Sequence, residues 1–212
     1  GLFVGSEGMF GIATEIILRL EPLPAAVRTL LAAFPSIRAA SEAVSGIIAA
    51  GIVPAAMEMM DQACVRAVEA SIYAAGYPAD AAAVLLVEVD GSAEATEAEA
   101  ALVESLLLRH RATEVRTATT AAERARLWQG RKKAFGAMGR ISPDLAVQDA
   151  VVPRSTLPDI LDRVAAIAAH YRLGVANVFH AGDGNLHPNI SFDAGDPDQV
   201  RRVHAANHDI MH

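Results

Sequence analysis

The sequence predicts an α+β fold with a mainly antiparallel sheet covered by helices. Along most of the 212 residues, segments with the alternation of half-buried strands are interleaved with amphipathic segments of helical period. Several strand segments are amphipathic, and two of them, within residues 175–192, are separated only by a short turn. These observations favour a mixed or antiparallel sheet with helices on one face over an all-parallel α/β sheet.

In the first half of the chain, turn residues and helix caps mark the predicted elements. Residues 1–24 begin with a glycine-rich turn, and an alternating strand and a proline-punctuated exit follow. Ser36 and Asp61 are predicted to cap two helices that end at Gly51 and Gly76. Strands are predicted at 27–34, 53–60 and 83–91.

In the second half, the same signals predict four further helices and four strands. A long Ala/Glu helix is predicted at 93–110, and a helix with a basic cluster at 120–138. Thr156 and Asp159 have the spacing of a capping box for a helix over 155–174. The last helix is predicted to begin near Pro197. Strands are predicted at 113–118 and 145–153, and as a pair across 175–192.

Composition excludes several classes of partner. A net charge of −7 and a pI near 5.5 argue against general binding to nucleic acid or to anionic membranes. No uncharged apolar run approaches the length of a membrane span. Cys64 is the single cysteine, which excludes an internal disulfide and favours a reducing, cytoplasmic compartment. We therefore expect a cytoplasmic protein.

The stretch VFHAGDGNLHPNI carries the strongest chemical signal in the chain. It places His180 and His187 on either side of a glycine-rich turn, where two imidazoles can face one another. Two imidazoles at that spacing can bind one divalent cation, although a zinc site usually needs three or four protein ligands. A hairpin with a polar, hydrogen-bonded tip explains the same residues, and the spacing leaves both interpretations open.

Two other motifs are weaker. Arg131 lies in the basic cluster of the predicted 120–138 helix, where it would either clamp a carboxylate or belong to a solvated helix face. The segment GSEGMFG has Gly5, Gly8 and Gly11, a spacing that fits neither a dinucleotide fingerprint nor a P-loop. Its free backbone N–H groups still suit a phosphate or a flavin.

Taken together, these segments resemble one branch of the FAD-linked oxidases of the vanillyl-alcohol oxidase type. VGSEGMFGIATEIILRLEPLP is similar to the segment that closes the flavin-binding domain in that family. AMEMMD, LWQGRKKAFGAMGRISPDLAVQDAVVPRSTLPDIL and FHAGDGNLHPNI are similar to successive landmarks of the branch. That branch holds D-lactate dehydrogenases, D-2-hydroxyglutarate dehydrogenases and the FAD-binding subunit of glycolate oxidase. The resemblance covers nearly the whole chain in order.

The resemblance implies a fold, a reaction and two cofactors. The implied fold is ferredoxin-like. A D-2-hydroxy acid would lose hydride to FAD and give the 2-oxo acid, and a quinone, a cytochrome or an electron-transfer flavoprotein would accept the electrons. The resemblance also implies a homo-oligomer or a set of oxidase subunits. It implies a location in the cytoplasm, or at the periphery of the inner membrane through the electron acceptor.

The resemblance also implies roles for individual residues. His180 and His187 match ligands of a divalent metal, commonly zinc, which would lower the pKa of the substrate hydroxyl. Arg131 matches the arginine that pairs with the substrate carboxylate, and Asn189 matches a substrate-side position. The residues implied to contact the flavin are Gly5, Ser6, Glu7, Gly8, Gly11 and Ile12.

The chain departs from the family pattern in ways that bear on substrate and completeness. The third metal ligand is expected in a Gly-Glu-His-Gly motif downstream of residue 212. Met9 and Phe10 stand where the family usually has Thr-Leu. Residues 146–148 are Ala-Val-Gln, without the extra basic residue of the hydroxyglutarate enzymes. We therefore expect a monocarboxylate such as lactate or glycolate.

These departures define the expected domain organisation. Residues 1–24 would be the C-terminal remnant of an FAD-binding domain, and residues 25–212 a substrate (cap) domain that is incomplete at its C-terminus. We expect this fragment alone neither to hold FAD tightly nor to turn over. The alternative is a non-catalytic ferredoxin-like module for ligand binding or oligomerisation. An aryl-alcohol or ether-lipid flavoenzyme is disfavoured by the histidine hairpin.

Overall fold

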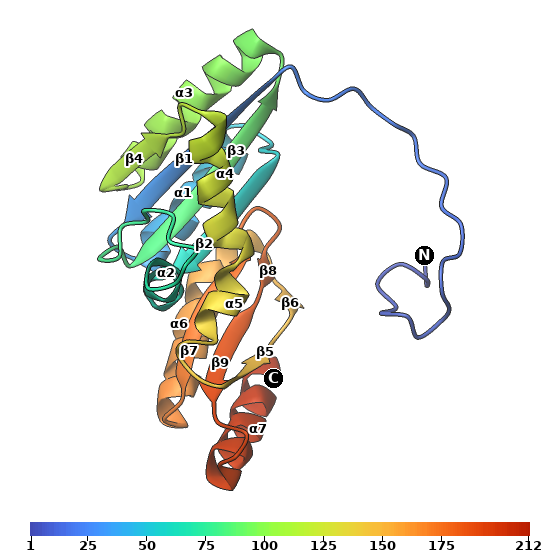
Figure 1. The fold of residues 1–212 in the computed structure, drawn as a ribbon, viewed down its shortest axis with the longest axis vertical. Coiled ribbons are helices and arrows are strands. Elements are labelled where there is room, and N and C mark those ends of the chain that lie inside the picture. The colour runs from blue at the N-terminus through green and yellow to red at the C-terminus, as the bar shows by residue number, and fades with distance from the viewer.

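The computed structural model describes residues 1–212, which form an exposed N-terminal segment and a folded body (Figure 1). Residues 1–25 contain no helix or strand, and nearly all of them are exposed. The alternating strand predicted within this segment is therefore absent. The physical reason is that a strand needs a neighbour for its backbone hydrogen bonds, and none of the nine strands pairs with these residues.

Residues 26–117, called here the first unit, have the ferredoxin-like arrangement. Their sheet has the order β4-β1-β3-β2, and every neighbouring pair is antiparallel. One helix connects β1 to β2 and another connects β3 to β4, as in a βαββαβ unit. The elements are β1 (Ala26–Phe34), α1 (Ile37–Ala49), β2 (Ala56–Asp61), α2 (Gln62–Glu69), β3 (Ala83–Gly91), α3 (Ala93–Arg109) and β4 (Glu114–Thr117).

Residues 144–211, called the second unit, repeat part of this plan. Strand β7 pairs with β2 and so joins the two units in one sheet, and β9 lies between β7 and β5. The strand order β5-β9-β7 corresponds to β1-β3-β2 of the first unit. The elements are β5 (Asp144–Val147), β6 (Ala150–Val151), a 3-10 turn (Arg154–Thr156), α6 (Leu157–His170), β7 (Gly174–His180), β8 (Asn185–Leu186), β9 (Pro188–Phe192) and α7 (Pro197–Met211).

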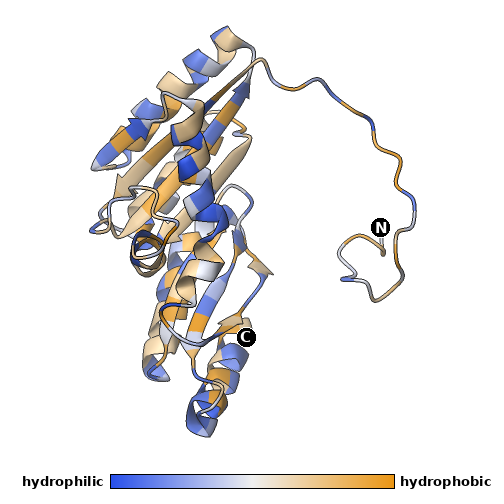
Figure 2. Cartoon of the chain, in the orientation of Figure 1, coloured by the Kyte–Doolittle hydropathy of each residue, from blue (hydrophilic) through white to orange (hydrophobic).

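Helices cover both faces of the sheet, not one face as predicted. On one face, α1, α3 and α6 pack on side chains such as Leu30, Phe34 and Leu85. On the other face, α2 packs with α4 (Ala121–Lys132) and α5 (Ala134–Met138) on side chains such as Leu31 and Leu86. Successive strand residues point to opposite faces, so β1 and β3, apolar on both sides, are buried on both. Figure 2 shows apolar strands between helices with polar outer faces.

A buried carboxylate fastens α4 to the sheet. Glu88 of β3 accepts hydrogen bonds from Arg124 Nε and Nη2 at 2.8 and 2.7 Å, from the Trp128 indole at 2.6 Å and from the Thr29 hydroxyl. Burial opposes ionisation of Glu88, but the hydrogen bonds from Arg124, Thr29 and Trp128 outweigh it and hold the pKa of Glu88 below its usual value. Two side chains of α4 thus bind one strand residue.

Several predicted boundaries are confirmed and others are wrong. The Ser36 and Asp61 side chains cap α1 and α2 as predicted. However, α2 ends at Glu69 and not at Gly76, because the Glu69 carboxylate accepts the backbone N–H groups of residues 75–77. The Thr156 hydroxyl donates to Pro153 O instead of forming a capping box.

Three predicted elements are divided. The predicted 120–138 helix breaks at Lys133 into α4 and α5. The predicted 145–153 strand divides because β5 pairs with β9 whereas β6 pairs with β8. The predicted strand pair at 175–192 contains three strands, β7, β8 and β9. No helix of the structure has both the length and the apolar character needed to span a bilayer.

Candidate functional site

The histidine hairpin is formed where β7 ends and β9 begins. His180 is the last residue of β7, and His187 stands between β8 and β9. Gly184 has a φ of +73°, and a Cβ there would lie 2.1 Å from Val152 O, so only glycine fits this turn. The turn places the two imidazole rings edge to face, with centroids 5.5 Å apart. The predicted juxtaposition of His180 and His187 is present.

A buried carboxylate from the neighbouring strand joins His180 to Arg131. In the antiparallel β2–β7 pair, Glu58 lies directly opposite His180. Glu58 Oε1 is 2.8 Å from His180 Nδ1, and Glu58 Oε2 accepts Arg131 Nε and Nη2 at 3.0 and 2.8 Å. Both Glu58 and Arg131 are buried. The sheet and α4 thus bring a cation, a carboxylate and an imidazole into one chain of contacts.

Arg131 is therefore not on a solvated helix face. The side chain is 9 % exposed, and it points from the last turn of α4 to the sheet. Arginine has five N–H donors, and the hydrogen bonds to Glu58 use Nε and Nη2. No hydrogen bond of the structure involves Nη1, so donors of this guanidinium remain for a further acceptor.

Asn189 holds the backbone of the hairpin. It is fully buried in β9, and its Nδ2 donates to Ala176 O at 3.0 Å and to His187 O at 2.6 Å. Its Oδ1 is buried and has no hydrogen-bond partner in the structure. Asn189 thus fixes the backbone at His187, and it keeps one acceptor free.

The second imidazole has looser surroundings. His187 is partly buried, and the Phe135 ring of α5 packs edge-on at a centroid distance of 6.3 Å. Its Nδ1 is 3.7 Å from Asp149 Oδ1, too far for a hydrogen bond. Asp149 is mostly exposed and accepts Asn185 Nδ2 at 3.0 Å. Each imidazole therefore has a carboxylate on its Nδ1 side, close for His180 and distant for His187.

The donor set fits half of a metal site. Two imidazoles bound to one tetrahedral ion at about 2.1 Å would have ring centroids ~5.4 Å apart, close to the distance between His180 and His187. Imidazole nitrogen suits zinc and other divalent transition metals. The chain groups no third His, Cys, Asp or Glu with this pair in a way that would hold an ion. By themselves, His180 and His187 therefore offer at most two ligand nitrogens.

A cavity of about 360 Å³ borders this site. Its wall includes Glu58 and His180, the turn residues Gly182 and Asp183, and Arg154. Arg154 Nη1 donates to Gly182 O at 2.7 Å, which braces the turn from the side of the 3-10 helix. The volume is at the lower end of the range for small-molecule pockets.

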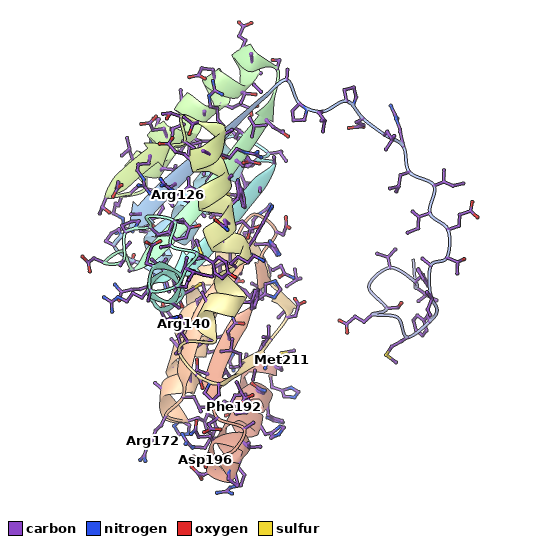
Figure 3. All side chains as sticks on the ribbon, viewed as in Figure 1. Arg126, Arg140, Arg172, Phe192, Asp196 and Met211 are labelled. Atoms are coloured by element: carbon purple, nitrogen blue, oxygen red, sulfur yellow. The ribbon has the colours of Figure 1, made fainter.

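The predicted flavin-contact residues lie outside this site. Gly5, Gly8 and Gly11 have positive φ values, as does Glu7, and Ser6 O accepts Met9 N at 2.9 Å. They form a turn in the exposed N-terminal segment, which extends away from the folded body (Figure 1). The structure does not bring Ser6 or Ile12 to the histidines. Figure 3 shows the side chains of this segment standing apart from those of the body.

Sequence reasoning missed Glu58 and Asp149. A signal for Glu58 was available, because AMEMMD places one carboxylate in the middle of an otherwise apolar strand segment. A buried carboxylate needs a partner, so the pattern indicates a buried ion pair. Asp149 had no comparable signal, since it lies in the short connection between β5 and β6.

The fold and the site together define a class of protein. It is an α+β domain made of a ferredoxin-like unit and a second unit that repeats part of it, and its joined sheet carries a histidine pair in contact with a buried Glu–Arg pair. Residues 23–212 match the family described as FAD linked oxidases, C-terminal domain. Because this match covers most of the chain, the chain belongs to that family.

Curated relatives are similar over nearly the whole chain. Glycolate oxidase subunit GlcD of Escherichia coli K12 is 50 % identical over 202 residues, covering 95 % of this chain and 40 % of the relative. Its Bacillus subtilis counterpart is 41 % identical, covering 99 % and 44 %. A mitochondrial D-lactate dehydrogenase (cytochrome) of Arabidopsis thaliana is 29 % identical, covering 100 % and 37 %. The chain spans about two fifths of the length of these relatives.

Solved structures share the fold at low sequence identity. An alkyldihydroxyacetonephosphate synthase superposes with a TM-score of 0.72 at 15 % identity, covering 98 % of this chain and 42 % of that one. A p-cresol methylhydroxylase superposes with a TM-score of 0.68 at 11 % identity, covering 89 % and 43 %. The predicted α+β class with a mainly antiparallel sheet is confirmed.

Proposed function

We propose that this chain is part of an FAD-dependent dehydrogenase that oxidises a D-2-hydroxy acid, glycolate or D-lactate, to the 2-oxo acid. Residues 25–212 would be its substrate domain, and residues 1–24 the end of its flavin domain. The observation that carries the proposal is the contact chain from Arg131 through Glu58 to His180, with His187 beside it. Membership of the FAD-linked oxidase family supports the same proposal.

Each side chain of the site has a role suited to a hydroxy acid. His180 and His187 would hold a divalent metal, and zinc is the ion that we propose. When bound, this ion supplies a Lewis acid for the substrate hydroxyl. The flavin, when bound, accepts the two electrons that leave the substrate. Arg131 would bind the substrate carboxylate through its remaining donors. Asn189 would keep His187 in place on the substrate side of the hairpin.

The preference for a monocarboxylate rests on the strand beside Asn189. Val147 of β5 is the register partner of Asn189 and is half exposed. Its neighbours Ala146 and Gln148 are uncharged, so this strand brings no cation for a second carboxylate. The names of the glycolate oxidase and D-lactate dehydrogenase relatives support the same choice.

The electron acceptor and the location of the whole protein are proposed from the family resemblance described above. A quinone, a cytochrome or an electron-transfer flavoprotein would reoxidise the flavin, either within a set of oxidase subunits or in a homo-oligomer. We place the protein in the cytoplasm, or at the inner membrane where its acceptor is bound to the membrane.

Assays of the intact protein with and without its histidine pair test the proposal. We expect it to reduce an artificial electron acceptor with glycolate or D-lactate and to reject D-2-hydroxyglutarate. His187→Ala should abolish this activity and lower the metal content, whereas His204→Ala on the exposed face of α7 should change neither. An intact protein without flavin absorbance, whose properties His187→Ala leaves unchanged, would instead support a non-catalytic binding module.

A further inference from the structure

We propose that Glu58 is a positioning residue that fixes His180 as the Nδ1–H tautomer and holds Arg131 in place by the same carboxylate. This tautomer leaves the lone pair of His180 Nε2 available for a cation. The purpose of this tautomer, metal binding, rests on the proposed function. The measured quantity, the position of a proton on His180, does not depend on turnover.

The two oxygens of Glu58 have different partners. Oε2 accepts two hydrogen bonds from Arg131, at 3.0 and 2.8 Å, and Oε1 is 2.8 Å from His180 Nδ1. A guanidinium has donors only and stays charged in proteins, so its partner is an acceptor. Beside the fixed positive charge of Arg131, Glu58 accepts these hydrogen bonds as an ionised carboxylate, which has no proton to give to His180. The proton of the Glu58–His180 contact therefore belongs to Nδ1.

Backbone pairing of β2 with β7, and not side-chain packing alone, fixes the contact between Glu58 and His180. Glu58 and His180 are register partners in the β2–β7 ladder, and the next pair, Met59 and Phe179, is fully buried. A slip of one residue would move Met59 and Phe179 from one face of the sheet to the opposite face, where Met60 and Val178 now pack. Glu58 thus approaches His180 from a rigid strand, not from a loop.

Asp149 is a carboxylate that lies near a histidine without fixing its tautomer. It stands on the Nδ1 side of His187 at 3.7 Å, and its side chain is 67 % exposed, whereas that of Glu58 is 11 % exposed. It leaves the tautomer of His187 unspecified, because no hydrogen bond joins the two. Asp149 therefore offers a matched control for Glu58 in the same hairpin.

Replacing Glu58 by glutamine should invert the tautomer while keeping the shape of the side chain. Arg131 offers only donors, so the amide oxygen must turn to Arg131 and the amide NH₂ to His180. His180 Nδ1 then has to accept a hydrogen bond, and its proton moves to Nε2. A protonated Nε2 cannot bind a metal ion.

Long-range ¹H–¹⁵N NMR on the histidine-labelled 212-residue chain reads the tautomer directly, at a pH where the imidazoles are neutral. We expect His180, identified by the signal lost in His180→Ala, to be the Nδ1–H form in the unchanged chain and in Asp149→Asn. Glu58→Gln should change it to the Nε2–H form. An Nε2–H form of His180 in the unchanged chain would overturn the proposal, even if Glu58→Gln failed to fold.

Metal affinity of the intact protein gives a second readout. Loss of a carboxylate that orients a metal-bound histidine typically weakens metal binding by about 10- to 100-fold. We expect a Zn²⁺ titration to show such a loss for Glu58→Gln and little change for Asp149→Asn. Equal losses for both variants would overturn the specific role of Glu58. Failure of the hydroxy-acid assay with the Nδ1–H tautomer present would refute the proposed function but not this inference.

Discussion

Replacing Gly130 by alanine tests how closely α4 packs beside Arg131. Helix propensity alone favours alanine, which is about 1 kcal/mol better than glycine inside a helix. The structure predicts the opposite sign. A Cβ at position 130 would lie 2.7 Å from the Tyr77 hydroxyl oxygen and 2.8 Å from the Ala75 Cβ, so the loop that carries both residues would have to move.

The magnitude follows from three contributions. Overpacking a buried contact costs about 1–3 kcal/mol. The Tyr77 hydroxyl donates to Leu127 O, and displacing the ring sacrifices this hydrogen bond, worth about 1 kcal/mol. The propensity gain of about 1 kcal/mol offsets part of the loss. We therefore expect Gly130→Ala to lower the free energy of unfolding by about 1–3 kcal/mol.

Urea unfolding followed by circular dichroism measures this difference. Gly136→Ala in α5 is the matched control, because a Cβ at position 136 would meet no atom within 4 Å. The control should unfold at a urea concentration equal to or above that of the unchanged chain, and Gly130→Ala below it. A Gly130→Ala variant as stable as the control would refute the close packing of α4 on residues 75–77.

Three further predictions concern Glu88, Gly184 and Cys64. Glu88→Gln should lower the free energy of unfolding by about 1–3 kcal/mol at neutral pH by weakening the hold on Arg124. Because the folded pKa of Glu88 is lowered, its contribution is present above the ordinary pKa and is lost as pH falls through the folded pKa. The urea midpoints of the two proteins should therefore converge in acid, below the ordinary pKa of a glutamate. Gly184→Ala should disrupt the hairpin, because the new Cβ would overlap Val152 O. The NMR signal of His187 should shift, and the amount of folded protein should fall. An unchanged spectrum would contradict the turn geometry. Burial raises the pKa of the Cys64 thiol well above its ordinary range, so a thiol reagent should label it only in denaturant, and rapid labelling of the folded chain would disprove its burial.

Local signals were sufficient to predict many of the elements. The strand at 83–91 was predicted with the bounds of β3, because a mainly apolar run ends at an Asp-Gly pair. Ser36 and Asp61 were recognised as helix caps because each side chain accepts a hydrogen bond from a backbone N–H only three residues further along the chain. The hairpin histidines were placed together for the same reason, since a short turn separates them.

The rest depends on contacts between distant parts of the chain. Arg131 and Glu58 are 73 residues apart, so the basic pattern of α4 alone did not indicate that this arginine is buried in an ion pair. The end of α2 is set by the Glu69 carboxylate, which satisfies three backbone N–H groups of a loop that resembles helix in sequence. Periodicity also failed for residues 14–24, where the alternation is present but no partner strand is.

The free edge of β5 has a consequence for the behaviour of this chain in solution. In the first unit β4 lies beside β1, whereas no strand of the structure lies on the outer side of β5. An edge with unpaired backbone groups is a template for strands of other molecules. The edge strand β4 has Glu114 and Arg116, which discourage such pairing, but β5 has a single charge, Asp144, at its first residue. Concentrated solutions of this chain should therefore aggregate through β5, and Val147→Lys should delay that aggregation.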